Sequence, residues 1–202
     1  MKVFLSWSGT RSKAVADTLG QWLAQVIQAV EPWISSEIEK GTRGASAIAE
    51  SLENAKVGII CLTADNLDAR WILFEAGALS KTKDSHVCTF LLDHSPADIE
   101  PPLGQFQHTI FAKDDIHKLV RTVNNRLEAS GGKPLSESKL STAFETYWPQ
   151  LEKAFSEIKA KKYSEPVQRP EREILEEMLE ILRGLRSFLA SPWAGFGRAF
   201  GP

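Results

Sequence analysis

Two long apolar runs constrain the fold of this 202-residue chain more than any other feature. They are "KVGIICLTA" at 56–64 and "HVCTFLLD" at 86–93. A strand that faces water on one side alternates apolar and polar residues, whereas a strand at the centre of a parallel sheet is covered on both faces and is apolar throughout. We therefore expect both runs to be central strands of a parallel sheet.

The segments around these runs alternate between strand and helix patterns. Shorter strands are predicted at 2–8, 31–35 and 108–112, and helical spacing of apolar residues covers 9–28 and 114–129. The alternation predicts an α/β fold of flavodoxin-like type, a five-stranded parallel sheet wrapped by helices with a C-terminal helical extension. Ligands of such sheets bind outside the carboxyl ends of the strands. These ends are "SWSG", "ISSEIEKG", "LTADN" and "LDHS".

Polar residues at the starts of two predicted helices suit the role of a cap. Thr10 or Ser12 is the expected cap of the first helix, and Asp114 or Asp115 that of the helix after the last strand. Side-chain oxygens of these residue types accept the backbone N–H groups that a helix leaves free at its start.

The chain divides into three segments. Residues 1–130 form the predicted sheet domain, 131–170 a linker with a helical segment kinked at Pro149, and 171–202 an amphipathic helix with a tail rich in glycine and aromatic residues. Five apolar residues form a stripe at helical spacing on the last helix: Leu175, Met178, Leu182, Leu185 and Leu189. Such a face has to be covered, either by the protein itself or by a second copy.

Composition argues against several classes of protein. The net charge of -2 gives no broad basic face for direct nucleic-acid binding. The apolar runs are shorter than the ~20 residues that span a bilayer, and the start of the chain has no signal-peptide pattern, so we expect a cytoplasmic protein without a membrane partner. Cys61 and Cys88 lie inside the two long runs and are expected to be inert core thiols. The histidines show no metal-ligand spacing, so no metal site is expected.

One acid stands out among the apolar residues of "ARWILFEAGALSK" at 69–81. Glu75 can be a solvated helix residue, a buried residue with a structural partner, or a catalytic carboxylate. Burial raises the pKa of a carboxyl group, so a catalytic glutamate here requires a partly open cleft. Trp71 lies one helical turn earlier on the same face.

Several motifs, in their order and spacing, resemble the TIR (Toll/interleukin receptor) domain family over residues 1 to about 127. They are "VFLSWSG", "EPWISSEIEKGTRGASAIAESLENA", "VGIICLT" and "ARWILFEAGAL". Trp71 and Glu75 match the W-x-x-x-E pattern of bacterial NAD-cleaving members. Ser35 and Ser36 depart from the family, because many relatives have an aspartate after the second strand.

The resemblance implies cleavage of the bond between nicotinamide and ribose in NAD⁺, with Glu75 as the catalytic carboxylate. NAD⁺ is then the substrate, and no cofactor is expected. The products are nicotinamide and ADP-ribose or a cyclic ADP-ribose isomer. The expected substrate-binding residues come from the first strand end, the loop at 36–46 and the W-x-x-x-E helix: Ser6, Trp7, Ser8, Gly9, Lys40, Arg43 and Trp71.

Two other functions remain open at this point. Many TIR domains are adaptors that act through TIR–TIR contacts without catalysis, and deoxyribosyltransferases use a glutamate on a similar sheet. The enzyme hypothesis places the chain in anti-phage defence. We expect a homo-oligomer formed through the TIR domains and the C-terminal helix, with a second defence protein as a further partner.

Overall fold

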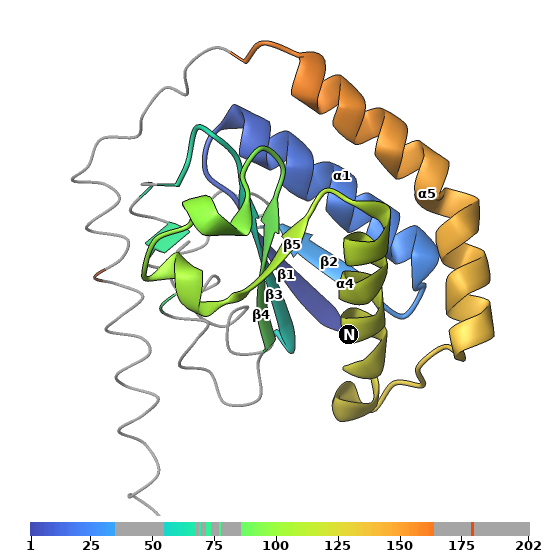
Figure 1. Cartoon of the computed structure of the whole chain (residues 1–202). Helices are drawn as coiled ribbons and strands as arrows, with labels where there is room; N and C mark the ends of the chain where they lie inside the picture. The colour runs from blue at the N-terminus through green and yellow to red at the C-terminus, as the bar shows by residue number, and fades with distance from the viewer. Residues whose placement is uncertain are drawn as a thin grey trace, which may run out of the picture.

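The computed structural model describes residues 1–34, 55–67, 69, 72–73, 77, 86–163 and 179. Five parallel strands form one sheet in the order β2-β1-β3-β4-β5 (Figure 1). The strands are β1 (Lys2–Ser6), β2 (Glu31–Ile34), β3 (Val57–Leu62), β4 (His86–Leu91) and β5 (Gln107–Ile110). The described α-helices are α1 (Thr10–Val26), α4 (Lys113–Asn125) and α5 (Glu137–Ala160). The predicted flavodoxin-like parallel sheet is confirmed.

The two long apolar runs form adjacent central strands. Every residue of β3 is buried, and β4 is buried over its last four residues. The two strands pair in parallel along their whole length, from Val57 opposite His86 to Leu62 opposite Leu91. β3 also pairs with β1, so the middle of the sheet has no free edge.

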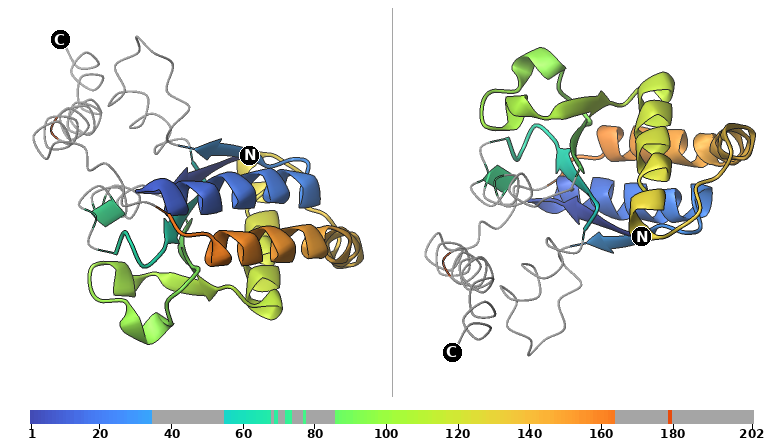
Figure 2. Two further views of the ribbon diagram at one scale, coloured as in Figure 1. Left: turned by 90° about the horizontal axis from the view of Figure 1, so that it is seen from above. Right: turned by 90° about the horizontal axis from the view of Figure 1, so that it is seen from below.

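The described helices share one face of the sheet. Side chains of α1, α4 and α5 form one apolar cluster with Val3 and Leu5 of β1 and with Val57 and Ile59 of β3. Figure 2 shows α1 and α5 side by side, with α4 on the same side of the sheet. On the opposite face, a smaller cluster joins Ile60 and Leu62 to Ile72, Ile99 and Leu103.

Helix α5 is part of the core, although it begins after the predicted sheet domain. Its six buried residues follow the helical spacing seen in the sequence: Leu140, Phe144, Trp148, Leu151, Phe155 and Ile158. The ring of Phe155 lies 5.2 Å from that of Phe90 on β4 and 5.1 Å from that of Phe111, measured between centroids. The last turns of α5 therefore pack directly against the sheet.

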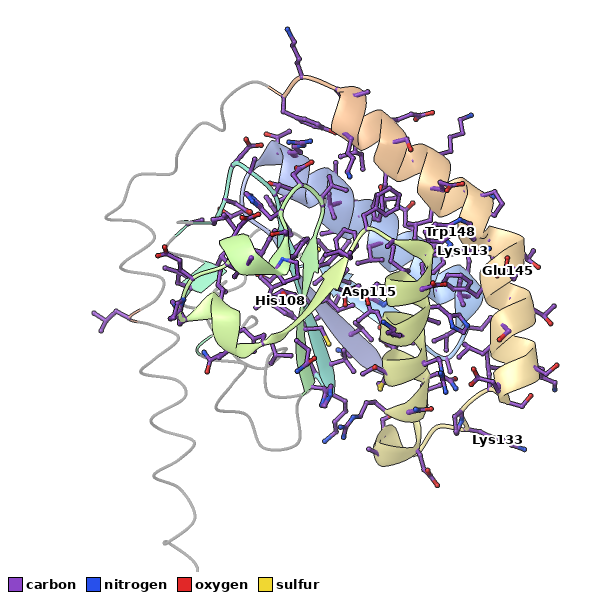
Figure 3. All side chains as sticks on the ribbon, in the orientation of Figure 1. His108, Lys113, Asp115, Lys133, Glu145 and Trp148 are labelled. Carbon is purple, nitrogen blue, oxygen red and sulfur yellow. The ribbon has the colours of Figure 1, made fainter. Side chains whose placement is uncertain are left out.

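Polar contacts fix α5 on its neighbours. The Trp22 indole of α1 donates a hydrogen bond of 2.9 Å to the carbonyl of Tyr147. Lys113 of α4 forms an ion pair of 2.7 Å with Glu145, beside Trp148 (Figure 3). Pro149 lies inside the continuous helix, which does not restart there. It lacks the N–H that would pair with the Glu145 carbonyl one turn earlier.

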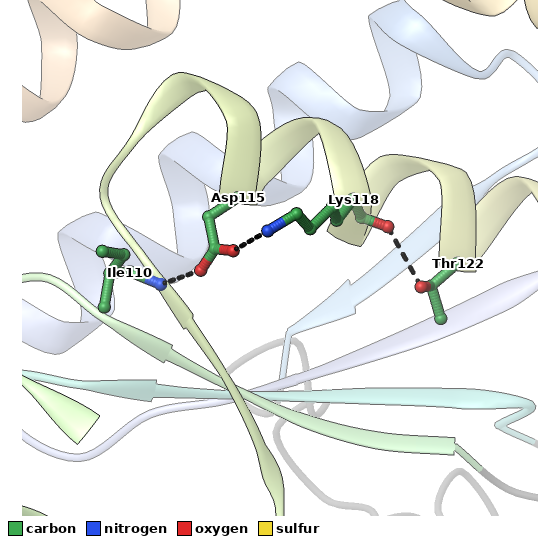
Figure 4. Close-up of polar contacts among 4 residues, drawn as sticks. All are labelled: Ile110, Asp115, Lys118 and Thr122. Carbon is green, nitrogen blue, oxygen red and sulfur yellow. Dashed lines mark hydrogen bonds and ion pairs between the residues drawn. The ribbon is translucent and has the colours of Figure 1, made fainter. Parts of the chain in front are cut away.

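The predicted helix caps are wrong. Gly9 precedes α1 with φ +88°, where a β-carbon would be strained, and the Ser12 hydroxyl donates to the Cys61 carbonyl instead of capping. Ala112 precedes α4, and no side chain caps that helix. Asp115, in its first turn, accepts the N–H of Ile110 at 2.9 Å and an ammonium hydrogen of Lys118 at 3.1 Å (Figure 4). Hydrogen bonds to the backbone of β3 and β5 therefore use the side chains of Ser12 and Asp115, which do not cap their helices.

Among the described residues, no helix combines the length and the apolar character that crossing a bilayer requires. The predicted helix at 171–202 lies outside the described residues except for Leu179, which is helical and exposed.

The packing of α5 predicts the effect of truncating Phe155. We expect Phe155→Ala to lower the free energy of unfolding by about 3–5 kcal/mol, because it removes a buried ring and leaves a cavity between α5 and β4. Urea denaturation followed by circular dichroism measures this change. Lys153→Ala on the exposed side of the same helix is the control and should shift stability by no more than about 0.5 kcal/mol. A loss below ~1 kcal/mol for Phe155→Ala would show that α5 unfolds separately from the sheet.

Candidate functional site

The carboxyl ends of β1, β3 and β4 bring polar residues to one edge of the sheet. The first segment, residues 6–9, begins with the last residue of β1. Residues 63–66 come after β3, and residues 93–95 come after β4. Because the strands are parallel and neighbouring, these short segments meet at one edge. Three of the strand ends named in the sequence as ligand-binding segments thus lie together.

The first predicted group, Ser6 to Gly9, lies at this edge. Ser6 is the last residue of β1, fully buried and paired with Ile60 of β3. Trp7 is partly buried against the main core, with the Lys13 ammonium 5.6 Å from its ring centroid. The Ser8 N–H donates to the Ser12 hydroxyl at 3.4 Å, and Gly9 forms the turn into α1.

A hydrogen-bond network built on one carbonyl joins three elements at the edge. The Cys61 carbonyl accepts from the Ser12 hydroxyl at 2.7 Å and from the Asn66 amide at 3.0 Å. The Asn66 side-chain oxygen accepts the N–H of Thr63 at 2.8 Å. Asn66 is 2% exposed, so this network is interior structure that holds the turn after β3 in one conformation.

Arg11 and Asp93 connect α1 to the loop after β4. Both guanidinium Nη atoms lie 3.0 Å from the two carboxylate oxygens, which is a bidentate pair. The two side chains are 16% and 19% exposed. An ion pair of this geometry, with both side chains mostly buried, fixes both residues at the edge and neutralises the charge of Asp93.

Four buried polar atoms have no hydrogen-bond partner within the described part of the chain. They are Trp7 Nε1, Arg11 Nε, Thr63 Oγ1 and His94 Nε2. All four belong to residues that follow β1, β3 or β4 or start α1, so they gather at the carboxyl edge. Buried polar atoms are nearly always paired in folded proteins, and those left unpaired call for an explanation. One explanation is a bound ligand that supplies the missing hydrogen-bond partners.

The cysteines do not supply a nucleophile to this edge. Both thiols are free and buried, as predicted. Burial raises the pKa of Cys61 far above its usual range and that of Cys88 to about 11, so both stay protonated at neutral pH. Within the described residues, no group of three or more histidine, cysteine or acidic side chains is placed to hold a metal ion.

Glu75, Trp71, Lys40 and Arg43 lie outside the described residues, and their predicted roles remain predictions. The chain just before Glu75 is placed at Ile72 and Leu73. Ile72 is fully buried in the smaller cluster, and the Leu73 N–H donates to the Ala69 carbonyl at 3.2 Å, as in a helix.

Sequence reasoning did not single out four residues of this edge: Arg11, Thr63, Asn66 and Asp93. Thr63, Asn66 and Asp93 fall in the segments "LTADN" and "LDHS", so the rule of carboxyl ends indicated their region. No signal in the sequence pairs Arg11 with Asp93, because 82 positions separate them.

The network predicts opposite effects for two substitutions at the turn after β3. Asn66→Ala removes the acceptor of a buried N–H and should lower the free energy of unfolding by about 1–3 kcal/mol. Thr63→Val removes a buried hydroxyl that has no partner and should leave stability unchanged or raise it. Thermal and urea denaturation of both variants test this. A clear loss of stability in Thr63→Val would mean that its hydroxyl is satisfied in the unliganded protein.

Comparison with known proteins places the chain in a family. No curated protein sequence matches it. A family described as TIR domain matches residues 3–123, more than half of the chain. The match runs from β1 into α4 and includes every strand and the candidate edge, while α5 follows it. This chain is therefore a member of the TIR domain family.

Proposed function

We propose that this protein cleaves the bond between nicotinamide and ribose in NAD⁺, with Glu75 as the catalytic carboxylate. TIR domains include both NAD⁺-cleaving enzymes and adaptors. The observation that favours the enzyme is a group of three unpartnered polar atoms at the carboxyl edge, Trp7 Nε1, Arg11 Nε and Thr63 Oγ1. An adaptor that acts through its outer surface gains nothing from buried donors and acceptors left unpaired, whereas a polar ligand at the edge would pair them.

The chemistry requires one well-placed negative charge. Nicotinamide leaves as a neutral molecule from a cationic ring, so its departure needs no general acid. The ribose gains positive charge as the bond breaks. A carboxylate that faces this charge stabilises the transition state more than the ground state. Water then attacks the cation to give ADP-ribose and a proton, or a nucleophile within the substrate attacks it to give a cyclic isomer.

The described edge residues can bind the rest of the substrate. The Nε–H of Arg11 is unpartnered while both of its Nη atoms hold Asp93, so Arg11 can donate to a diphosphate oxygen without releasing its partner. The Trp7 indole N–H and the Thr63 hydroxyl supply further hydrogen bonds. Ser6, Ser8 and Gly9 form the floor in this proposal, with Lys40 and Arg43 at the phosphates and Trp71 beside nicotinamide.

The biological setting proposed here is cytoplasmic anti-phage defence. In this proposal TIR domains associate, with the C-terminal helix adding to the contact, and a second defence protein acts with the assembly. TIR domains generally self-associate, which supports a homo-oligomer. The competing adaptor function would use the same assembly without NAD⁺ cleavage.

Removing the charge of Glu75 tests the mechanism. We expect Glu75→Gln to reduce nicotinamide release from NAD⁺ by at least ~100-fold, the scale seen when one preorganised electrostatic group is lost. Chromatographic quantification of nicotinamide measures the rate, and circular dichroism with a thermal melt checks folding. A folded variant that cleaves NAD⁺ at the wild-type rate would refute the role of Glu75.

The wild-type protein is assayed in parallel with deoxynucleosides. Transfer or release of a base would indicate a deoxyribosyltransferase-like enzyme. A self-associating wild type that cleaves neither class of substrate would identify an adaptor.

Shortening the chain tests the role of the C-terminal segment. Helix α5 ends at Ala160. A chain that ends there keeps every described residue except Lys161 to Tyr163 and Leu179. We expect the full-length protein to form at least dimers and the shortened one to be more monomeric and slower on NAD⁺. Light scattering and the NAD⁺ assay on both proteins measure this. The same number of subunits per particle and the same rate of NAD⁺ cleavage in both proteins would show that residues 161–202 contribute nothing to assembly.

A further inference from the structure

A hollow of about 290 Å³ lies between the ends of β4 and β5 and the last turn of α5, and Asp93 of the candidate site is part of its wall. Apolar side chains form much of its wall: Leu91, Leu92, Pro96, Ile110 and Phe111. Three residues that can carry charge, Asp93, His94 and Lys159, complete it, together with Ser95. Apolar walls with a few converging polar groups are typical of small-molecule sites.

Lys159 brings a positive charge to the hollow and has no counter-ion within the described part of the chain. Its ammonium lies 5.2 Å from the ring centroid of Phe111. Among the described residues, none of the ion pairs involves Lys159. The ammonium therefore keeps its hydrogen-bond donors available for an anion.

His94 brings a buried nitrogen that needs a partner. Its side chain is 19% exposed, and Nε2 is buried with no hydrogen bond in the described structure. The other ring nitrogen, Nδ1, lies 3.9 Å from a carboxylate oxygen of Asp98, too far for a hydrogen bond. The Asp98 carboxylate is itself occupied by the N–H of Ser95 at 2.8 Å. The His94 ring lines the hollow, and a ligand oxygen there would give Nε2 its missing partner once the ring turns this buried atom toward the hollow.

Asp93 does not exclude an anion from this hollow. Both of its carboxylate oxygens are held by the Arg11 guanidinium at 3.0 Å, so the pair is close to neutral. The charge that remains at the wall is that of Lys159.

We propose that this hollow binds a phosphate ester with a small, flat organic body, such as a mononucleotide. Lys159 holds the phosphate, and the ring of Phe111 and the aliphatic wall cover the body. His94 turns its ring toward the hollow, so that Nε2 pairs with an oxygen of the ligand. The volume of about 290 Å³ lies at the lower limit of small-molecule pockets, about 300 Å³, and therefore restricts the ligand to a small one. This site depends on α5, which lies beyond residues 3–123 of the TIR match, so it is a feature of this chain's extension.

Isothermal titration calorimetry on the full-length protein tests the proposal with three probes. They are AMP, adenosine, which lacks the phosphate, and inorganic phosphate, which lacks the body. We expect AMP to bind more tightly than either. Lys159→Met should weaken AMP binding by at least ~10-fold, the scale of one lost charge-assisted hydrogen bond, and Lys159→Arg should retain it. His94→Leu should also weaken it.

The control is Lys153→Met, which removes the same charge from an exposed position of the same helix. It should bind AMP like the wild type, so an effect of net charge alone is separated from contact with the ligand.

Three results would overturn the proposal: no AMP binding to the wild type at ~5 mM, unchanged binding in Lys159→Met, or adenosine binding as tightly as AMP. AMP is the adenylate half of NAD⁺ and can also enter the proposed NAD⁺ site, so the Lys159 variants carry the distinction: Lys159→Met should weaken AMP binding and leave nicotinamide release from NAD⁺ unchanged. Loss of the proposed enzyme activity and loss of this site therefore give different results.

Discussion

The burial of β3 on both faces determines where this protein can place polar groups. Each of its residues is covered, by the helices α1, α4 and α5 on one face and by the smaller cluster around Ile72 on the other. A polar side chain within such a strand would need a partner in an apolar interior, which costs free energy. The first polar side chain, Thr63, appears where the strand ends, and Asp65 and Asn66 follow. The Cys61 carbonyl with its two donors, Ser12 and Asn66, marks this change from apolar sheet to polar edge.

Helix α5 extends the fold beyond the TIR match and also reaches the edge. The same turns that place Phe155 against Phe90 carry Lys159 to the end of β5. Phe155 and Lys159 are four positions apart, which is about one turn of an α-helix. The two side chains therefore lie on the same side of α5, one buried against the sheet and one at the end of β5. Packing that stabilises the sheet therefore also fixes the charge at the proposed phosphate site.

The sheet could be predicted from the sequence because its signal is local. The apolar runs at 56–64 and 86–93 identify buried strands on their own, and the apolar residues from 140 to 158 predict a helix. What could not be predicted depends on contacts between distant segments. Ser12 and Asp115 have the residue types of helix caps, yet hydrogen bonds to β3 and β5 use their side chains. The first strand ends at Ser6 instead of residue 8, because the backbone bends at Gly9 to start α1.

The candidate site shows the same division. Ser6 to Gly9 could be assigned to the edge because they follow a strand, and Thr63 and Asp93 were indicated only as parts of strand ends. The unpartnered atoms could not be foreseen, since the absence of a partner is a property of the packed structure. Glu75 rests on the family pattern and its apolar neighbours and remains a prediction.

The unpartnered atoms have an energetic meaning for the proposed functions. A buried donor or acceptor left unpaired costs about 1–3 kcal/mol, and folded domains are stable by only about 5–15 kcal/mol. Four such atoms in one region are a substantial cost that packing elsewhere, such as α5 on the sheet, has to offset. A ligand that pairs them recovers part of this free energy on binding.

The unpartnered atoms divide between the two proposed sites. Trp7, Arg11 and Thr63 would contribute at the proposed NAD⁺ site and His94 at the proposed phosphate site. The Arg11–Asp93 pair is common to both proposed sites, because Arg11 Nε belongs to the first and Asp93 lies in the wall of the second.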